Sequence, residues 1–168
     1  MNITKKIIIT DTNIITDLSE ANVLLEFIML DNVYICDMIK VNEINEQTGN
    51  IEIINKMKVI SATSEDINRI IEIQKDNPKL SVYDCINFVI SKKYNALLAT
   101  GDKRLREYAL KEGVEVIRTI YIIKMLYEKE VIMKKQLITA FENLLKSKKC
   151  RIPKEDIEKE LEIYKIEI

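Results

Sequence analysis

The amino-acid sequence predicts an α/β fold with a mainly parallel central sheet, followed by helices alone. Short apolar runs typical of buried strands alternate with segments whose apolar residues recur at helical spacing. Strands that are separated by helices pair in parallel, with right-handed crossovers. After Arg118 only helical patterns remain. We therefore expect an α/β domain over residues 1–120 and a helical C-terminal extension over residues 121–168, which packs on that domain or serves assembly.

The predicted strands are short and strongly apolar. The first of them, "KIIIT", is a continuous apolar run, as expected for a central strand that helices cover on both faces. The expected strands are residues 6–10, 32–36, 57–61, 95–100 and 114–117.

Capping residues mark where the first two helices begin. The sequence "TDTN" offers several N-cap residues after the first strand, and a helical pattern follows it through residue 30. After the second strand, Asp37 can cap a helix over residues 37–47, which Gly49 ends.

The helices in the second half of the chain have similar signals. Thr63 or Ser64 begins a helix that continues to residue 76. Ser81 is followed three residues later by Asp84, an acidic variant of the capping box, and apolar residues then recur at helical spacing. Residues 101–112 form the last helix of the α/β domain, and the C-terminal helix of the extension starts at Pro153.

Composition narrows the class of protein. At 168 residues and 47% hydrophobic, the chain can bury one sizeable core. Its net charge of −1 gives no global basic field, so nucleic-acid binding would depend on a local patch. We find no signal-peptide pattern, no apolar stretch near the ~18 residues that span a bilayer, and no C-x-x-C motif among the three cysteines. We expect a cytoplasmic protein that does not enter a membrane.

The residue types that are absent exclude several kinds of chemistry. The chain has no histidine, which excludes H-E-x-x-H zinc sites and nucleophile–histidine pairs. It has three glycines, too widely spaced for either of the glycine-rich phosphate-binding motifs. The groups that remain for catalysis are mainly carboxylates.

Four carboxylates occupy positions that can converge. Asp11 and Asp102 are the first acidic residues after two different predicted strands, Glu43 lies in the helix after the second strand, and Asp84 begins a later helix. In an open α/β sheet the ligand site lies beyond the carboxyl ends of the strands. Each residue alone also has an ordinary structural role, as a helix cap, a first-turn acid or a surface glutamate.

Convergence of these carboxylates would favour a bound cation. Two unit charges 4 Å apart repel by about 4 kcal/mol at an effective dielectric constant near 20. Such a cluster therefore either keeps a proton at a raised pKa or binds a divalent ion. Because all the donors are oxygen atoms, Mg²⁺ or Mn²⁺ suits the cluster better than Zn²⁺.

The segments that carry these residues resemble the PIN domain family of metal-dependent ribonucleases, which includes the VapC-type toxins. The matching segments are "IIITDTNII", "MIKVNEI" and "LSVYDCINFVISKKYNALLATGDKRL", in the family's order. The resemblance covers about the first 120 residues and implies a three-layer α/β sandwich. The helical extension also resembles one branch of the family.

The resemblance implies a site and a reaction. Asp11, Glu43, Asp84 and Asp102 would be the catalytic residues and metal ligands, with Asn13 and Thr100 as accompanying polar residues. A metal-activated water would hydrolyse RNA and leave a 5′-phosphate and a 3′-hydroxyl. Because the family includes toxins of toxin–antitoxin pairs, an antitoxin protein and a second copy of the chain are the expected partners.

Contacts to RNA would come from basic and aromatic residues near the carboxylates. The basic candidates are Lys103, Arg104 and Arg106, together with the run "KSKKCR" at residues 146–151. Tyr83 either stacks on a base or packs on the protein. We expect Asp17 to be an exposed helix acid outside the site.

Other functions also fit parts of the sequence. A catalytically silent PIN-like module that binds nucleic acid or protein would keep the same acidic residues. A D-x-D-x-T phosphatase is disfavoured because the second residue after Asp11 is Asn13. A receiver domain needs a phosphoacceptor aspartate after a middle strand, which "YICD" imitates only loosely.

Overall fold

A computed structural model describes residues 6–45 and 48–166. Five parallel strands form one sheet in the order β3-β2-β1-β4-β5. The strands are β1 (Ile8–Thr10), β2 (Val33–Cys36), β3 (Lys58–Ile60), β4 (Leu97–Ala99) and β5 (Val116–Ile117). All five lie within the predicted segments, so the expected parallel α/β fold is confirmed.

Strand β1 lies at the centre of the sheet. Its two isoleucines and its threonine can all be buried under the helices that cover both faces. It pairs with β2 through Ile8 and Val33, and with β4 through Ile8 and Leu97. Ile8, Ile9 and Thr10 are completely buried. The chain therefore leaves the sheet at Asp11, between two neighbouring strands and at their carboxyl ends.

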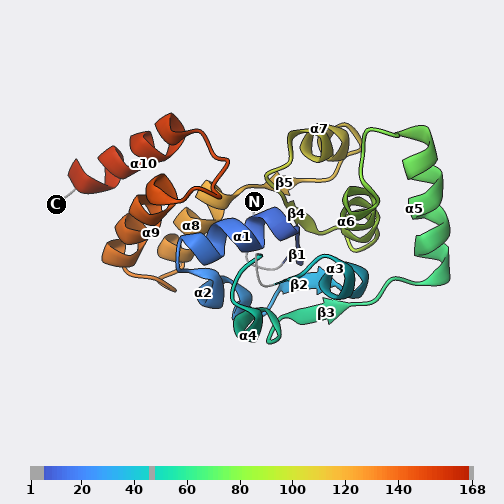
Figure 1. Ribbon diagram of the computed structural model, residues 1–168, viewed down its shortest axis with the longest axis horizontal. Coiled ribbons are helices and arrows are strands. Elements are labelled where there is room, and N and C mark those ends of the chain that lie inside the picture. The colour runs from blue at the N-terminus through green and yellow to red at the C-terminus, as the bar shows by residue number, and fades with distance from the viewer. Residues whose placement is uncertain (1–5, 46–47, 167–168) are drawn as a thin grey trace.

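Helices cover both faces of the sheet (Figure 1). The helices of the α/β part are α1 (Thr12–Glu20), α2 (Leu24–Ile28), α3 (Asp37–Asn42), α4 (Ile51–Ile54), α5 (Ser64–Asp76), α6 (Val82–Lys93) and α7 (Lys103–Lys111). Helix α6 packs on β1, β2 and β4, with α5 and α7 against it, and α2 packs on β2 beside α1. These contacts give the three layers of an α/β sandwich.

Three helix boundaries differ from the sequence prediction. The first helical pattern divides into α1 and α2, because Asn22 adopts a left-handed backbone conformation with φ of 60°. Helix α3 ends at Asn42, well before Gly49, and residues 46–47 of the predicted helix lie outside the described residues. Asn50 caps the short helix α4, which the sequence analysis did not anticipate.

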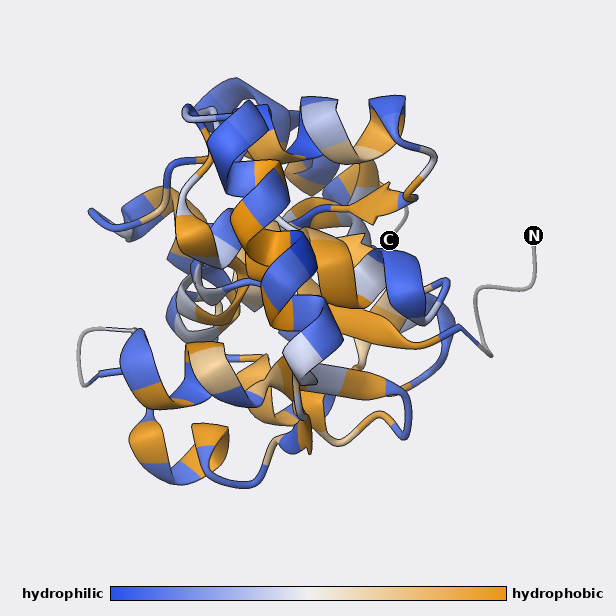
Figure 2. Cartoon of the chain, turned by 90° about the vertical axis from the view of Figure 1, so that its right-hand side faces the viewer, coloured by the Kyte–Doolittle hydropathy of each residue, from blue (hydrophilic) through white to orange (hydrophobic). Residues whose placement is uncertain are grey.

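The last three helices pack against the first. They are α8 (Thr119–Glu128), α9 (Lys134–Lys146) and α10 (Lys154–Ile166). Helices α8 and α9 contact α1, and α10 contacts α9. Leu137, Phe141 and Leu144 of α9 are buried. The hydrophobic residues gather along the strands and the inward faces of helices (Figure 2), so the C-terminal helices share one core with the sheet.

Within the described part of the chain, every helix is too short or too polar to cross a bilayer.

Candidate active site

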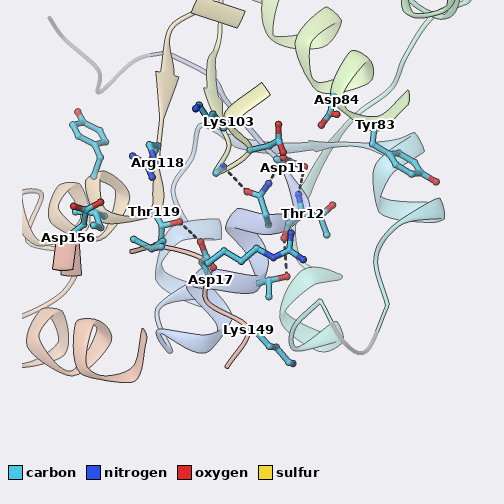
Figure 3. Close-up of a pocket in the computed structure, with 18 of the residues that line it drawn as sticks. Asp11, Thr12, Asp17, Tyr83, Asp84, Lys103, Arg118, Thr119, Lys149 and Asp156 are labelled. Carbon is cyan, nitrogen blue, oxygen red and sulfur yellow. Dashed lines mark hydrogen bonds between the residues drawn. The ribbon is translucent and has the colours of Figure 1, made fainter. Parts of the chain in front are cut away.

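One cavity of about 1090 Å³ opens beyond the carboxyl ends of β1 and β4. It is lined by all four carboxylates that the sequence analysis proposes for the site: Asp11, Glu43, Asp84 and Asp102. Figure 3 shows Asp11 and Asp84 on its wall. The cavity also has a wall from the C-terminal helices, which the sequence analysis did not foresee.

Asp11 is the most firmly held of the four carboxylates. The backbone N–H of Thr12 and the Asn87 side chain donate to Asp11 Oδ1, at 2.7 and 3.2 Å. The side chains of Asn13 and Thr100 donate to Asp11 Oδ2, at 2.7 and 2.8 Å. With 6% of its surface exposed, Asp11 is a fixed wall of the cavity rather than a mobile surface acid.

Asn13 and Thr100 connect Asp11 to the loop after β4. Asn13 Oδ1 accepts the backbone N–H of Gly101 at 2.8 Å, and Thr100 Oγ1 accepts that of Asp102 at 3.1 Å. A Cβ at Gly101 would lie 3.2 Å from Asn13 Oδ1, which is closer than ordinary contact. The two polar residues therefore hold the ends of β1 and β4 in register at the site.

The other three carboxylates each use one oxygen for a local hydrogen bond. Thr12 Oγ1 donates to Glu43 Oε2 at 2.5 Å, and Glu43 is the C-cap of α3 rather than an interior helix residue. Asp84 Oδ2 accepts the Ser81 N–H at 2.7 Å in a capping box. Asp102 Oδ1 caps α7 by accepting the Leu105 N–H at 2.8 Å. Asp11 and Asp102 are thus N-caps, Asp84 completes the capping box of Ser81, and all three also line the cavity.

The donor set suits a hard divalent cation. Within the described residues, no protein donor contacts Glu43 Oε1, Asp84 Oδ1 or Asp102 Oδ2, so three carboxylate oxygens on one cavity wall are available. No three acidic or cysteine side chains of the described chain are gathered closely enough to enclose an ion by themselves. Mg²⁺ suits such a site because it keeps several waters and takes only one or two carboxylates directly.

The protonation of Asp11 depends on its surroundings. Burial raises the pKa of its carboxyl from the ordinary value of 3.8 to about 6, while the hydrogen bonds from Thr100 and Thr12 limit the increase. The negative charges of Glu43 and Asp84 also raise this pKa. The repulsion expected from converging carboxylates is therefore present at Asp11.

We expect Asp11 to make the metal-free protein less stable as the pH rises. The folded-state pKa, about 6, lies above the unfolded value of 3.8, so the stabilising contribution is complete below about pH 4 and is lost through pH 6. The difference corresponds to about 3 kcal/mol, at about 1.4 kcal/mol per pKa unit. The test is urea unfolding of wild type and of Asp11→Asn in EDTA, from about pH 4 to 7. The contribution of Asp11 is the difference between the two plots of unfolding free energy against pH. Parallel profiles would contradict the assignment.

Two residues near the site were missed or misjudged from the sequence. Asn87 is buried and donates to Asp11; its place one turn after Asp84 on the same helix was the available signal. The prediction that Asp17 is exposed is wrong: Asp17 is 8% exposed, lines the cavity and accepts the Thr119 hydroxyl at 2.7 Å. The reason is that α8 and α9 cover α1.

The predicted basic and aromatic contacts divide between the cavity and other surfaces. Lys103 lines the cavity, but Arg104 and Arg106 do not, because only the first residue of α7 reaches it. From the run at 146–151, the lining residues are Lys148, Lys149, Arg151. Tyr83 lines the cavity next to Asp84 (Figure 3).

The family model described as "PIN domain" matches residues 7–165. The chain belongs to the PIN domain family. The match includes the sheet, all four carboxylates and nearly all of the C-terminal helices, so it extends beyond the 120 residues on which the resemblance was recognised. PIN domains are generally nucleases and typically use divalent metal ions. A search of curated proteins finds no match.

Proposed function

We propose that this PIN domain is a Mg²⁺- or Mn²⁺-dependent endoribonuclease that hydrolyses RNA phosphodiesters in the four-carboxylate cavity. The observation that carries the proposal is the setting of Asp11, which four hydrogen-bond donors orient on a wall shared with Glu43, Asp84 and Asp102. Burying a carboxylate costs stability even when it is hydrogen-bonded, and a carboxyl whose pKa is raised by burial and by neighbouring charges is typical of functional sites.

Each side chain has a defined part in the proposed reaction. One or two of Glu43, Asp84 and Asp102 would contact the cation directly, through the oxygens that no protein donor contacts, and the remainder would accept hydrogen bonds from its waters. A bound divalent cation supplies a water of lowered pKa and neutralises charge on the phosphoryl oxygens. Asp11, ionised above about pH 6, completes the negative pocket, and Thr100 keeps its orientation.

Substrate contacts are available beside the carboxylates. Lys103 follows Asp102 directly and can neutralise a phosphate next to the scissile bond. The half-buried Tyr83 offers a ring on which an unpaired base can stack. A basic and an aromatic residue flanking the carboxylates favour a nucleic-acid substrate over a small phosphate ester.

The chemistry of the products tests this proposal. Purified protein should cleave end-labelled single-stranded RNA in Mn²⁺ but not in EDTA, and the fragments should carry 5′-phosphates that a 5′-phosphate-dependent exonuclease accepts. Contaminating metal-independent ribonucleases give 5′-hydroxyls and cyclic phosphates instead, so the end groups separate the two sources. Matched DNA strands should remain uncut. Cleavage that persists in EDTA, or fragments with 5′-hydroxyls, would refute the mechanism.

The biological setting that we propose is the toxin of a toxin–antitoxin pair in the cytoplasm. Its support is the likeness of the core motifs to the VapC-type branch, which implies an antitoxin partner and a possible homodimer. Induced expression in a bacterial host should arrest growth for wild type and not for Asp84→Asn. Equal growth of the two strains would contradict the proposal that the protein is a toxin, and it would not affect the nuclease proposal.

A second candidate function is that of a module that binds RNA without cleaving it. The absence of an enclosed metal cluster among the described residues favours it, because all of Asp11's oxygens are already engaged by the protein. This candidate predicts RNA binding without cleavage in any divalent metal, and the product assay separates the two.

A further inference from the structure

Asp156 and Glu160 line the part of the cavity that the C-terminal helices form, together with five cations. The cations come from the start of α8, from the connection between α9 and α10, and from α10. We call the following residues the cationic wall: Arg118, Lys148, Lys149, Arg151 and Lys159. In the view of Figure 3, Asp84 is at the upper right, Arg118 is at the left near Asp156, and Lys149 is at the bottom.

The cationic wall does not serve to neutralise the carboxylates. Among the described residues, no ion pair joins a cation of the wall to any of the four carboxylates. The charges that raise the pKa of the Asp11 carboxyl are the acidic ones of Glu43 and Asp84. Arg151 acts instead on Asp17. No ion pair within the described chain involves Arg118, Lys148 or Lys159. Much of the wall's positive charge is therefore available to a ligand.

The connection that carries these cations is fixed to the rest of the fold. Ser147 Oγ donates to Glu20 Oε2 at 2.7 Å, and Lys149 Nζ lies 3.6 Å from Glu20 Oε1. Ser147 Oγ also accepts the backbone N–H of Lys149 at 3.1 Å. Glu20 is the last residue of α1, the helix that Asp11 caps. One helix therefore links the carboxylates at its start to the cationic wall at its end.

Helix α10 is held in the same way. Its Glu160 pairs with Lys124 of α8 at 3.0 Å, and Ile157 and Leu161 are buried. Lys159 is exposed between these residues and lines the cavity. The segments that carry the wall are thus held in place by the fold, and its lysine and arginine side chains are exposed on them.

We propose that the cationic wall binds the backbone phosphates of single-stranded RNA that extends away from the scissile phosphate. Phosphate binding by lysine and arginine needs no base sequence and explains a separate basic surface on a chain with a net charge of −1. Tyr121, 38% exposed, lines the cavity near Arg118 and can stack on an unpaired base, which favours a single strand. The identity of the ligand rests on the proposed function.

A matched pair of charge reversals tests the proposal. Lys148→Glu/Lys159→Glu alters the wall, and Lys146→Glu/Lys154→Glu is the control: it changes the net charge equally, in the same segment, at exposed lysines outside the cavity. Neither pair touches the Ser147–Glu20 contacts or Arg151. Circular dichroism and thermal unfolding show whether both variants fold as wild type does.

The measurement is fluorescence anisotropy of a labelled single-stranded RNA in EDTA, where no cleavage occurs, over a series of salt concentrations. We expect the wall variant to bind about tenfold more weakly than wild type or worse, and the control to bind within about twofold of it. The slope of log K against log salt should decrease in magnitude by about 1.4 for two lost phosphate contacts, at about 0.7 per contact on a single strand.

Several results would overturn this inference. They are equal losses in the two variants, an unchanged salt slope, no RNA binding by wild type, or equally tight binding of a matched duplex or a poly-aspartate peptide. The proposed nuclease function fails separately, when wild type binds RNA through the wall yet does not cleave it in Mn²⁺.

Discussion

Asp84→Asn is expected to lower the rate of metal-dependent RNA cleavage by on the order of 10³-fold, comparable to removing one charge-stabilising group from an active site. Asparagine keeps an oxygen that can accept the Ser81 N–H, so the capping box and helix α6 should persist. What it removes is a negative charge and the carboxylate oxygen that no protein donor contacts. Single-turnover cleavage of labelled RNA in Mn²⁺ measures the loss.

Asp156→Asn is the matched control for this substitution. Asp156 lines the same cavity and lies in the first turn of α10, but it is not among the four carboxylates. Its replacement should leave the rate within about twofold of wild type. Equal rates for Asp84→Asn and wild type would remove Asp84 from the site, and equal losses in both variants would indicate a general dependence on cavity charge.

Phe141→Ala is expected to destabilise the whole protein by about 3–5 kcal/mol, a large share of the stability of a domain of this size. Phe141 is completely buried in α9, which packs on α1. Removing its ring leaves a cavity in the core that the C-terminal helices share with the sheet. Urea unfolding followed by circular dichroism gives the change in the free energy of unfolding.

Ile163→Ala provides the comparison. Ile163 lies on α10 and is 51% exposed, so its truncation should change stability by about 0.5 kcal/mol or less. A small effect of Phe141→Ala, or an unfolding curve with two separate transitions, would show that residues 121–168 fold independently of the sheet.

The sequence predicts the sheet well because its strands have a strong local signal. The central strands are short apolar runs, and strand β1 must be buried on both faces since "IIIT" has no polar face to expose. The positions of Asp11 and Asp102 follow from the same logic, because parallel strands place the residues that follow them at one edge.

What the sequence could not predict depends on contacts between distant segments. Asp17 looks like a surface acid on α1 until α8 packs against it and the Thr119 hydroxyl pairs with it, 102 residues away. Asn87 shows its role only once α6 lies against β1 and reaches Asp11. The basic run at residues 146–151 is a candidate RNA contact from the sequence, but its place in the cavity wall depends on how α9 and α10 pack, which has no local signal.

The structure also changes how the capping signals are interpreted. From the sequence, a role at a helix start and a role in the site are alternatives for Asp11, Asp84 and Asp102. In the structure each side chain accepts a backbone N–H at the start of a helix and also lines the cavity. The two roles are compatible because a carboxylate has two oxygens. Helix N-termini also stabilise negative charge, so this arrangement lowers the cost of gathering acids at one site.

The central claim is that a divalent cation in the acidic cavity enables this PIN domain to cleave RNA. The most direct measurement is the initial rate of cleavage of one labelled single-stranded RNA as Mn²⁺ is titrated into EDTA-treated protein. The account predicts no detectable rate without metal, a saturable rise with Mn²⁺, and loss of the rate when EDTA is returned in excess. A rate that is independent of Mn²⁺ throughout the titration would contradict it.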